Sequence, residues 1–333
     1  MVAPVLSYEM PNSVLRKAGL EAELFAGKRK RISTCSGVAW IPETDRLVTI
    51  NMHNSVLNGF ALDTSRGSAM PANLSHLWEL DSRESMGLHR TENIAFSGSL
   101  GLMALSNTGT GVVQFFDIDT VAKDRPVRGI KPVFTLGGFP DTSLHGVSFD
   151  AQGQLCCVTT VAPGSINVYK VRRTTDSEIQ VSLLHRLSNA RKPLRPKDVC
   201  FSPCGHWLAI GYTMRIGTQV GRAAGLISIH AWDRVAEKVL EDAIDVFRWA
   251  NSVETLVWSR DGIVYATDQL SDQITAHQVD LKTGVFVRHR IFSGGKAGGL
   301  SMPHGLCLSP DDRFLIATNY GTDSISVFEL KRD

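Results

Sequence analysis

Short runs of alternating apolar and polar residues recur along the chain, and turns rich in Gly, Asp or Pro separate them. Six segments share one order: an apolar pair, a turn, a run rich in β-branched and aromatic residues, a polar break and a second alternating run. No long segment carries helical periodicity, so the pattern predicts strands throughout. The first apolar residues of the six copies are Val38, Ile94, Val147, Val199, Leu256 and Leu306.

These six anchor positions lie 50 to 57 residues apart, which is the spacing of propeller blades rather than of helical repeats. Each copy supplies three strands, and an outer fourth strand follows most copies. The last copy ends without one, whereas the β-rich run Glu21–Ala26 precedes the first copy. We therefore expect an all-β, six-bladed β-propeller of four-stranded blades, a single domain over residues 1–333. Its N-terminal strand, Glu21–Ala26, would close the last blade and remove two exposed sheet edges.

The overall composition excludes several classes of protein. The chain is 43% hydrophobic and 20% charged with a formal net charge of +2, which favours a large core and predicts no nucleic-acid partner. No stretch has the apolar run of a signal peptide or a membrane span, so we expect a cytoplasmic protein with no membrane partner. The six cysteines include no Cys-x-x-Cys pair and are expected to be buried thiols.

The last copy, MPHGLCLSPDDRFLIATNYGTDSISVFEL, resembles the repeats of lactonase-type propellers. The wider set of copies resembles the gluconolactonase-like and strictosidine-synthase-like propellers. Lactonase-type propellers commonly have seven blades, whereas six copies are present here. The resemblance implies the fold and a choice of activities: lactone or other hydrolysis, carbon–carbon bond formation, or no reaction.

The mouth of the central channel is the predicted site. The first strand of each blade lines this channel, and the residue two positions before each anchor is ionisable in five of the six copies. Clustered charges cost desolvation free energy unless they are paired or used, so this pattern favours a functional site. The predicted catalytic residues are Glu92, His145, Lys197, Glu254 and His304, and Ser36 completes the ring as a substrate-binding residue.

Blade order sets the expected pairing within this ring. Each histidine has a glutamate in the preceding blade, which places Glu92 before His145 and Glu254 before His304. A carboxylate beside an imidazole orients it and suits proton transfer near neutral pH. The alternative is an ion-pair ring that only fills the channel together with water.

A second polar set follows the second strand of each copy. The substrate-binding residues predicted here are Asn51, His53, Asn107, Thr159, Asp268 and Asn319. Turn chemistry is the alternative, because Asn and Asp favour such bends. In blade four the loop at 213–225 is about ten residues longer than its counterpart in blade six. Its Arg215 is expected to reach over the mouth as part of a lid, and a plain surface insertion is the alternative.

Two chemistries fit these residues. The gluconolactonase resemblance implies a divalent metal held by carboxylate and asparagine side chains, a set that Glu92, Glu254, Asn107 and Asp268 could imitate. The Lys197 ammonium opposes a hard cation there, and two imidazoles suit zinc or iron better than calcium. Without a metal, a histidine or glutamate would activate water, the opposite histidine would donate a proton, and Lys197 would stabilise an oxyanion.

We therefore expect an enzyme that acts on a small polar or carbonyl-containing metabolite. The reaction would be lactone or ester hydrolysis, or a related isomerase, lyase or cyclase reaction, with no organic cofactor. The alternative is a non-catalytic propeller that serves as a protein interaction scaffold, although no Trp-Asp repeat signature supports it.

Overall fold

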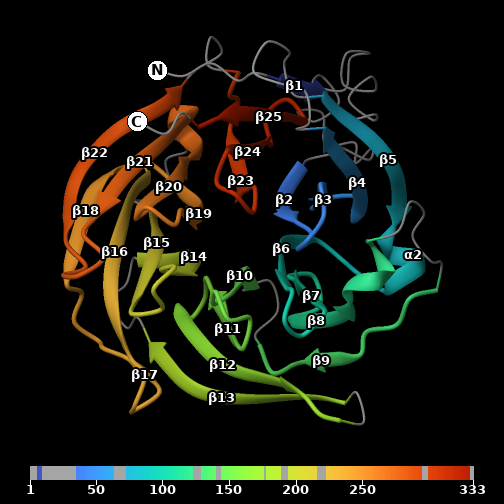
Figure 1. Ribbon diagram of the computed structural model, residues 1–333, viewed down its shortest axis with the longest axis horizontal. Helices are drawn as coiled ribbons and strands as arrows, with labels where there is room; N and C mark the ends of the chain where they lie inside the picture. The colour runs from blue at the N-terminus through green and yellow to red at the C-terminus, as the bar shows by residue number, and fades with distance from the viewer. Residues whose placement is uncertain are drawn as a thin grey trace.

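The computed structural model describes residues 6–9, 35–63, 73–122, 129–139, 144–175, 178–188, 194–215, 223–294 and 299–330. In these ranges six antiparallel sheets surround a central axis, as Figure 1 shows. The prediction of an all-β propeller with six blades is confirmed. Within the same ranges no helix is long and apolar enough to cross a lipid bilayer.

In each blade the strands run outward from the axis in chain order, except that the N-terminal strand forms the outer edge of blade six. Blades one and two contain β2 (Cys35–Trp40), β3 (Arg46–Asn51), β4 (Val56–Asp63) and β5 (Asn73–Asp81), then β6 (Thr91–Ser97), β7 (Leu102–Asn107), β8 (Val112–Asp117) and β9 (Phe134–Leu136). Blades three and four contain β10 (Leu144–Phe149), β11 (Leu155–Thr160), β12 (Ser165–Arg173) and β13 (Ile179–Ser188), then β14 (Leu194–Phe201), β15 (Trp207–Arg215) and β16 (Ala223–Asp233), which pairs with both β17 (Lys238–Val239) and β18 (Asp245–Ala250). Blades five and six contain β19 (Val253–Trp258), β20 (Ile263–Asp268), β21 (Gln273–Val279) and β22 (Phe286–Gly294), then β23 (Pro303–Leu308), β24 (Phe314–Asn319) and β25 (Ser324–Glu329).

An N-terminal strand completes blade six, as predicted, but a different segment supplies it. Strand β1 (Leu6–Glu9) pairs antiparallel with β25, opposite Ser324 to Val327. The predicted segment Glu21–Ala26 lies outside the described residues. An edge is filled through backbone hydrogen bonds, so any short β-rich segment within reach can take that position, and composition alone could not choose between the two.

The blades are apolar on both faces, because each packs between two neighbours. Along β24, Ile316 belongs to the buried cluster shared with blade one, whereas Leu315 and Ala317 belong to the cluster shared with blade five. This alternation is the period of two that the sequence pattern predicted. Five of the six cysteines are buried, and all six are free thiols.

Every innermost strand carries a β-bulge near its start. In blade one, the register advances three residues along β2, from Cys35 to Val38, while it advances two along β3. The same one-residue excess occurs in β6, β10, β14, β19 and β23. A bulge breaks the regular alternation of side chains and re-aims the extra residue. The same β-bulge therefore occurs six times around the channel, once in each blade.

Candidate functional site

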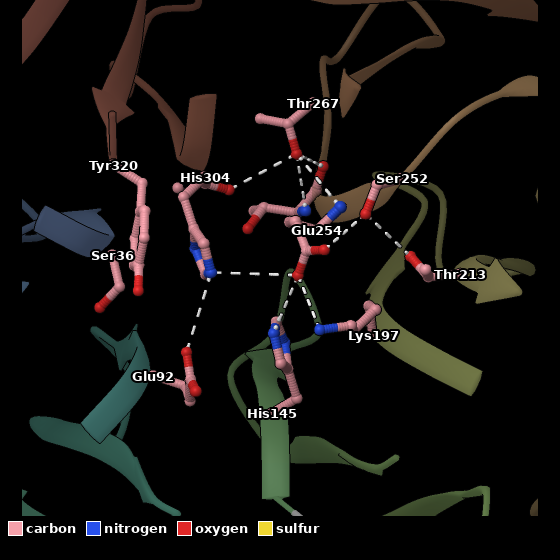
Figure 2. Close-up of polar contacts among 12 residues, drawn as sticks. Ser36, Glu92, His145, Lys197, Thr213, Ser252, Glu254, Thr267, His304 and Tyr320 are labelled. Atoms are coloured by element: carbon pink, nitrogen blue, oxygen red, sulfur yellow. Dashed lines mark hydrogen bonds and ion pairs between the residues drawn. The ribbon is translucent and has the colours of Figure 1, made fainter. Parts of the chain in front are cut away.

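The six bulges hold the six ring residues that the sequence pattern selected. Five of them bring ionisable side chains to one place, which Figure 2 shows around Glu254. Glu254 Oε2 lies 2.9 Å from Lys197 Nζ and 3.1 Å from His145 Nε2. The side chains of Glu92, His145, Glu254 and His304 are at most 10% exposed, whereas that of Lys197 is 21% exposed. Lys197 is therefore the ring residue most open to a ligand.

His304 lies between the two carboxylates. Its Nε2 is 3.8 Å from Glu92 Oε2 and 3.9 Å from Glu254 Oε2, and its ring stacks on that of His145 with centroids 5.6 Å apart. The expected neighbour pairing is therefore met for His304 and Glu254. His145 makes its closest carboxylate contact with Glu254, two blades further on, while Glu92 of the preceding blade has an oxygen within 4.8 Å of it. The side chains reach across the channel, so blade order does not fix which groups meet.

Buried hydroxyls hold the ring residues in register between blades. The hydroxyls of Ser106, Thr159 and Thr318, in blades two, three and six, each accept a hydrogen bond from a backbone N–H of their own blade at 2.7 to 2.9 Å. They also donate to the carbonyl of the next blade's ring residue at 2.6 to 2.8 Å: Ser106 to His145, Thr159 to Lys197, and Thr318 to Ser36. Thr159, predicted to bind substrate, thus ties two blades together. Ser36, also predicted to bind substrate, likewise uses its hydroxyl on backbone, donating to Ile50 O at 3.1 Å.

Glycine makes these close approaches between blades possible. A Cβ on Gly305, the residue after His304, would lie 2.3 Å from Ser36 O. A Cβ on Gly146, the residue after His145, would lie 2.8 Å from Lys197 O. Larger side chains would push the inner strands apart, so these glycines set the width of the ring.

The second polar set fixes loops. Asn107 Oδ1 accepts from His89 N at 2.9 Å, and Asn319 Oδ1 accepts from Ser301 N at 3.1 Å. Asp268 Oδ1 accepts from Ser252 N at 3.1 Å. In each case the partner belongs to the loop that leads into the first strand of the same blade, in agreement with the turn-chemistry alternative.

The remaining members of this set lie elsewhere. Asn51 is buried opposite Cys35, at the register position that Asn107 occupies in blade two. His53 is exposed, and its Nε2 lies 2.7 Å from the Tyr320 hydroxyl. The side chain of Arg215 and the loop 216–222 lie outside the described residues, so the lid remains a prediction.

Several contacts to the ring were not visible in the sequence. The Tyr320 ring stacks on His304 with centroids 5.7 Å apart, which forms a continuous stack with His145. Ser252 donates to Glu254 Oε1 at 2.7 Å. In the sequence Tyr320 directly follows Asn319, and Ser252 stands two residues before Glu254. That closeness to predicted site residues is the signal that could have found them.

Burial and charge set the protonation of two ring groups in opposite ways. Burial alone would raise the pKa of Glu254, but the Lys197 ammonium and His145 outweigh it and hold the pKa well below its ordinary value. Glu254 is therefore a fixed anion that binds and orients its neighbours. Burial lowers the pKa of His304 despite both nearby carboxylates, so its imidazole is neutral near pH 7.

The carboxylate and asparagine set that a gluconolactonase-type metal would need does not assemble. Asn107 Oδ1 and Asp268 Oδ1 each accept hydrogen bonds from loop backbone. A different group does converge, because one ligand atom each of Glu92, His145 and His304 lies within 4.8 Å of the others. The side chains at the channel mouth therefore do not provide the carboxylate and asparagine ligands that a gluconolactonase-type metal site would need.

Comparison with known proteins gives a family and a fold. Residues 34–333 match the sequence profile described as the SMP-30/Gluconolactonase/LRE-like region. No curated protein sequence matches the chain. Similar solved structures include a candidate 6-phosphogluconolactonase from Bacteroides uniformis, with a TM-score of 0.58 and 14% identity over 89% of this chain and 81% of that chain.

Two other similar structures carry unrelated descriptions. The Kuenenia stuttgartiensis hydrazine synthase has a TM-score of 0.55 and 13% identity, over 92% of this chain and 99% of that chain. The β-propeller domain of Myceliophteria thermophila Cps50 (Swd1) has a TM-score of 0.56 and 11% identity, with the same coverages. At such identities the likeness shows the fold alone.

Proposed function

The chain belongs to the SMP-30/gluconolactonase/LRE-like family, and from that premise we propose that it hydrolyses a small lactone or ester at the channel mouth. The observation that carries the proposal is the convergence on Glu254, whose Oε2 binds Lys197 and His145 within 3.1 Å in a nearly closed setting. Five ionisable side chains cost desolvation free energy in a channel that serves only as a scaffold. Hydrolysis of a carbonyl substrate would use these side chains to place the water, to transfer its proton and to stabilise the oxyanion.

Lys197 is the group suited to the developing oxyanion. It is a cation, it is the most exposed of the five, and Glu254 holds it at 2.9 Å. When water attacks the carbonyl carbon, negative charge moves to the carbonyl oxygen, and a fixed ammonium beside that oxygen stabilises the transition state. Because Glu254 stays ionised, it keeps Lys197 and His145 oriented in both the ground and transition states.

Glu92 and His304 are suited to place the attacking water. Their facing atoms are 3.8 Å apart, too far for a direct hydrogen bond, and Glu92 Oε2 has no hydrogen-bond partner in the described part of the chain. The water gives its proton to this pair as its oxygen bonds to the carbonyl carbon. The pair returns the proton to the leaving alkoxide when the carbon–oxygen bond of the ester breaks, so that one water is added overall.

The test is turnover of a panel of γ- and δ-lactones and simple esters, followed by the acid released into a pH indicator. We expect the wild type to hydrolyse at least one member, and Glu254→Gln to lose about 10²- to 10³-fold in kcat/KM. Glu178→Gln, an exposed glutamate in the β12–β13 hairpin, is the matched control and should keep wild-type rates.

Circular dichroism and thermal unfolding show whether Glu254→Gln is folded. If it is not, Lys197→Met tests the same contact from the more exposed side. Wild-type rates in a folded Glu254→Gln, or no hydrolysis of any member by the wild type, would contradict the proposed function.

A further inference from the structure

The outer edge of blade five differs from the other outer edges of the propeller. Strand β22 is the outermost strand of its sheet and, among the described residues, pairs with β21 alone (Figure 1). Its five consecutive residues Val287–Ile291 are all exposed, whereas no described stretch of that length in the outer strands β5 and β13 is exposed throughout. An edge strand with unpaired backbone donors and acceptors can pair with another chain.

The exposed stretch combines apolar and basic side chains. Val287 is 67% exposed and Ile291 is 49% exposed, and Val285, just before the strand, is also exposed. No other outer strand in the described part of the chain carries more than one exposed large apolar side chain. Arg288 and Arg290 lie between the apolar residues, two positions apart, so they share one face of the strand.

The two arginines give this edge a positive charge. Neither Arg288 nor Arg290 forms an ion pair with an acidic side chain of the described residues. Asp245 of the adjoining strand β18 and Asp280 of the preceding turn each accept a hydrogen bond from a backbone N–H. An acidic side chain on a neighbouring strand would therefore meet two cations that form no such pair within this chain.

Blade four holds the edge in shape. The Phe247 ring of β18 lies 4.8 Å from the His289 ring, and Asp245 Oδ2 accepts from Phe286 N at 3.0 Å. On the inner side His277 lies opposite His289 in the β21–β22 ladder, and its ring lies 4.4 Å from that of Phe247. These contacts fix β22 in advance, so binding would need to order only the partner segment.

We propose that β22 binds an extended acidic segment of a partner protein, which adds to blade five as a fifth strand. Backbone hydrogen bonds supply the affinity, and side chains supply the specificity: Asp or Glu opposite Arg288 and Arg290, and apolar residues beside Val287 and Ile291. A second copy of this chain fits less well. Antiparallel pairing centred on His289 would place Arg288 opposite Arg290 of the copy, and like charges in that position repel.

The experiment is fluorescence anisotropy of three labelled peptides titrated with the full-length protein. The first peptide alternates Glu with Val, the second has Lys in place of every Glu, and the third has Pro in place of every Val. The third keeps the charge but loses the backbone donors that a strand needs. We expect the acidic Glu–Val peptide to bind with a Kd in the micromolar range, and the other two to bind at least about tenfold more weakly.

A charge reversal at the edge tests the position of the site. Arg288→Glu should weaken binding of the acidic peptide by about tenfold or more, because it places like charges opposite each other. Arg172→Glu, which reverses an exposed arginine on β12 of blade three, is the matched control and should bind like the wild type. In the wild type, the peptide should also slow hydrogen exchange of the backbone amides in Val287–Ile291.

Several results would overturn the inference. These are no binding of the acidic peptide, equal binding of the proline peptide, unchanged exchange at β22, or wild-type binding by a folded Arg288→Glu. Tighter binding of a DNA oligonucleotide than of the peptide would assign the edge to nucleic acid instead. Glu254 lies on the innermost strand of the same blade, so Arg288→Glu should leave lactone turnover unchanged, and failure of either proposal leaves the other standing.

Discussion

Asp198, the residue that follows Lys197, is a single side chain that links two blades beside the ring residues. It is 3% exposed, and its Oδ2 accepts from Leu256 N of blade five at 2.9 Å. Blade four has Gly211 where blades two, three, five and six have a serine or threonine, so Asp198 supplies the link to the next blade there. Burial raises the pKa of this carboxyl to about 7, which makes it neutral over much of the acidic range.

Replacing Asp198 by Asn should change how stability depends on pH. The folded pKa of about 7 exceeds the ordinary value of 3.8, so the folded state binds the proton more tightly and wild-type stability falls as pH rises from about 4 to about 7. Asn cannot ionise, and Asn93 already occupies the equivalent position in blade two. We expect Asp198→Asn to raise Tm by a few degrees at pH 8 relative to the wild type, and to give no gain at pH 5. An equal Tm difference at the two pH values would contradict this account.

For single residues, the sequence predicted which positions form the ring better than it predicted which side chains contact one another. The ring residues follow from a fixed offset to each apolar anchor, because the bulge falls at the same place in every blade. The link between His145 and Glu254 across the channel, and the stacking of Tyr320 on His304, depend on how far side chains reach. Spacing along the chain carries no measure of that reach.

The ends of the strands were harder to predict from the sequence than the strands themselves. Leu144 pairs with Thr160 in blade three as Thr91 pairs with Asn107 in blade two, so Thr160 rather than Thr159 is the counterpart of Asn107. In blade four β15 runs on to Arg215 without a polar break to mark its end. Register depends on backbone pairing, and a one-residue error moves a side chain to the other face.

The closing strand can be tested through its register. Ser7 of β1 lies opposite Ser326 of β25, and paired Cα atoms in adjacent antiparallel strands are within reach of a disulfide. We expect Ser7→Cys combined with Ser326→Cys to form a disulfide under oxidising conditions and to raise Tm.

The control for the closing strand pairs Ser7→Cys with Ser324→Cys, two residues out of register. This pair should cross-link poorly and leave Tm unchanged. Equal cross-linking of both pairs, measured by mass spectrometry of peptide digests, would show that β1 does not hold this position.

Across the whole molecule, the site depends on closure of the ring. Six blades each contribute one bulge residue, and hydrogen bonds between neighbouring blades join one inner strand to the next. The all-β class, the six blades and closure by an N-terminal strand were predictable because they follow from period and spacing. The family match over residues 34–333 confirms the resemblance to gluconolactonase-like propellers.

Loss of one bond between blades should weaken both stability and turnover. Thr159→Val keeps the shape of the side chain but removes the donor to Lys197 O and the acceptor for Gly146 N. We expect a loss of about 1–3 kcal/mol in unfolding free energy, measured by denaturant titration, together with reduced kcat/KM. Thr49→Val is the control, because Thr49 is equally buried and, among the residues that the structure describes, its hydroxyl makes no hydrogen bond to the backbone of a neighbouring blade. Similar losses in the two variants would mean that the bond to Lys197 has no special role.

Whether hydrolysis occurs at the channel mouth is decided by comparing lactone or ester turnover by Lys197→Met, Glu254→Gln and the double variant. If the two residues act as one unit at the channel mouth, each single change lowers kcat/KM by about a hundredfold or more. The double variant then loses little beyond the worse single variant. Folded single variants with wild-type kcat/KM would contradict the claim that hydrolysis occurs in this ring.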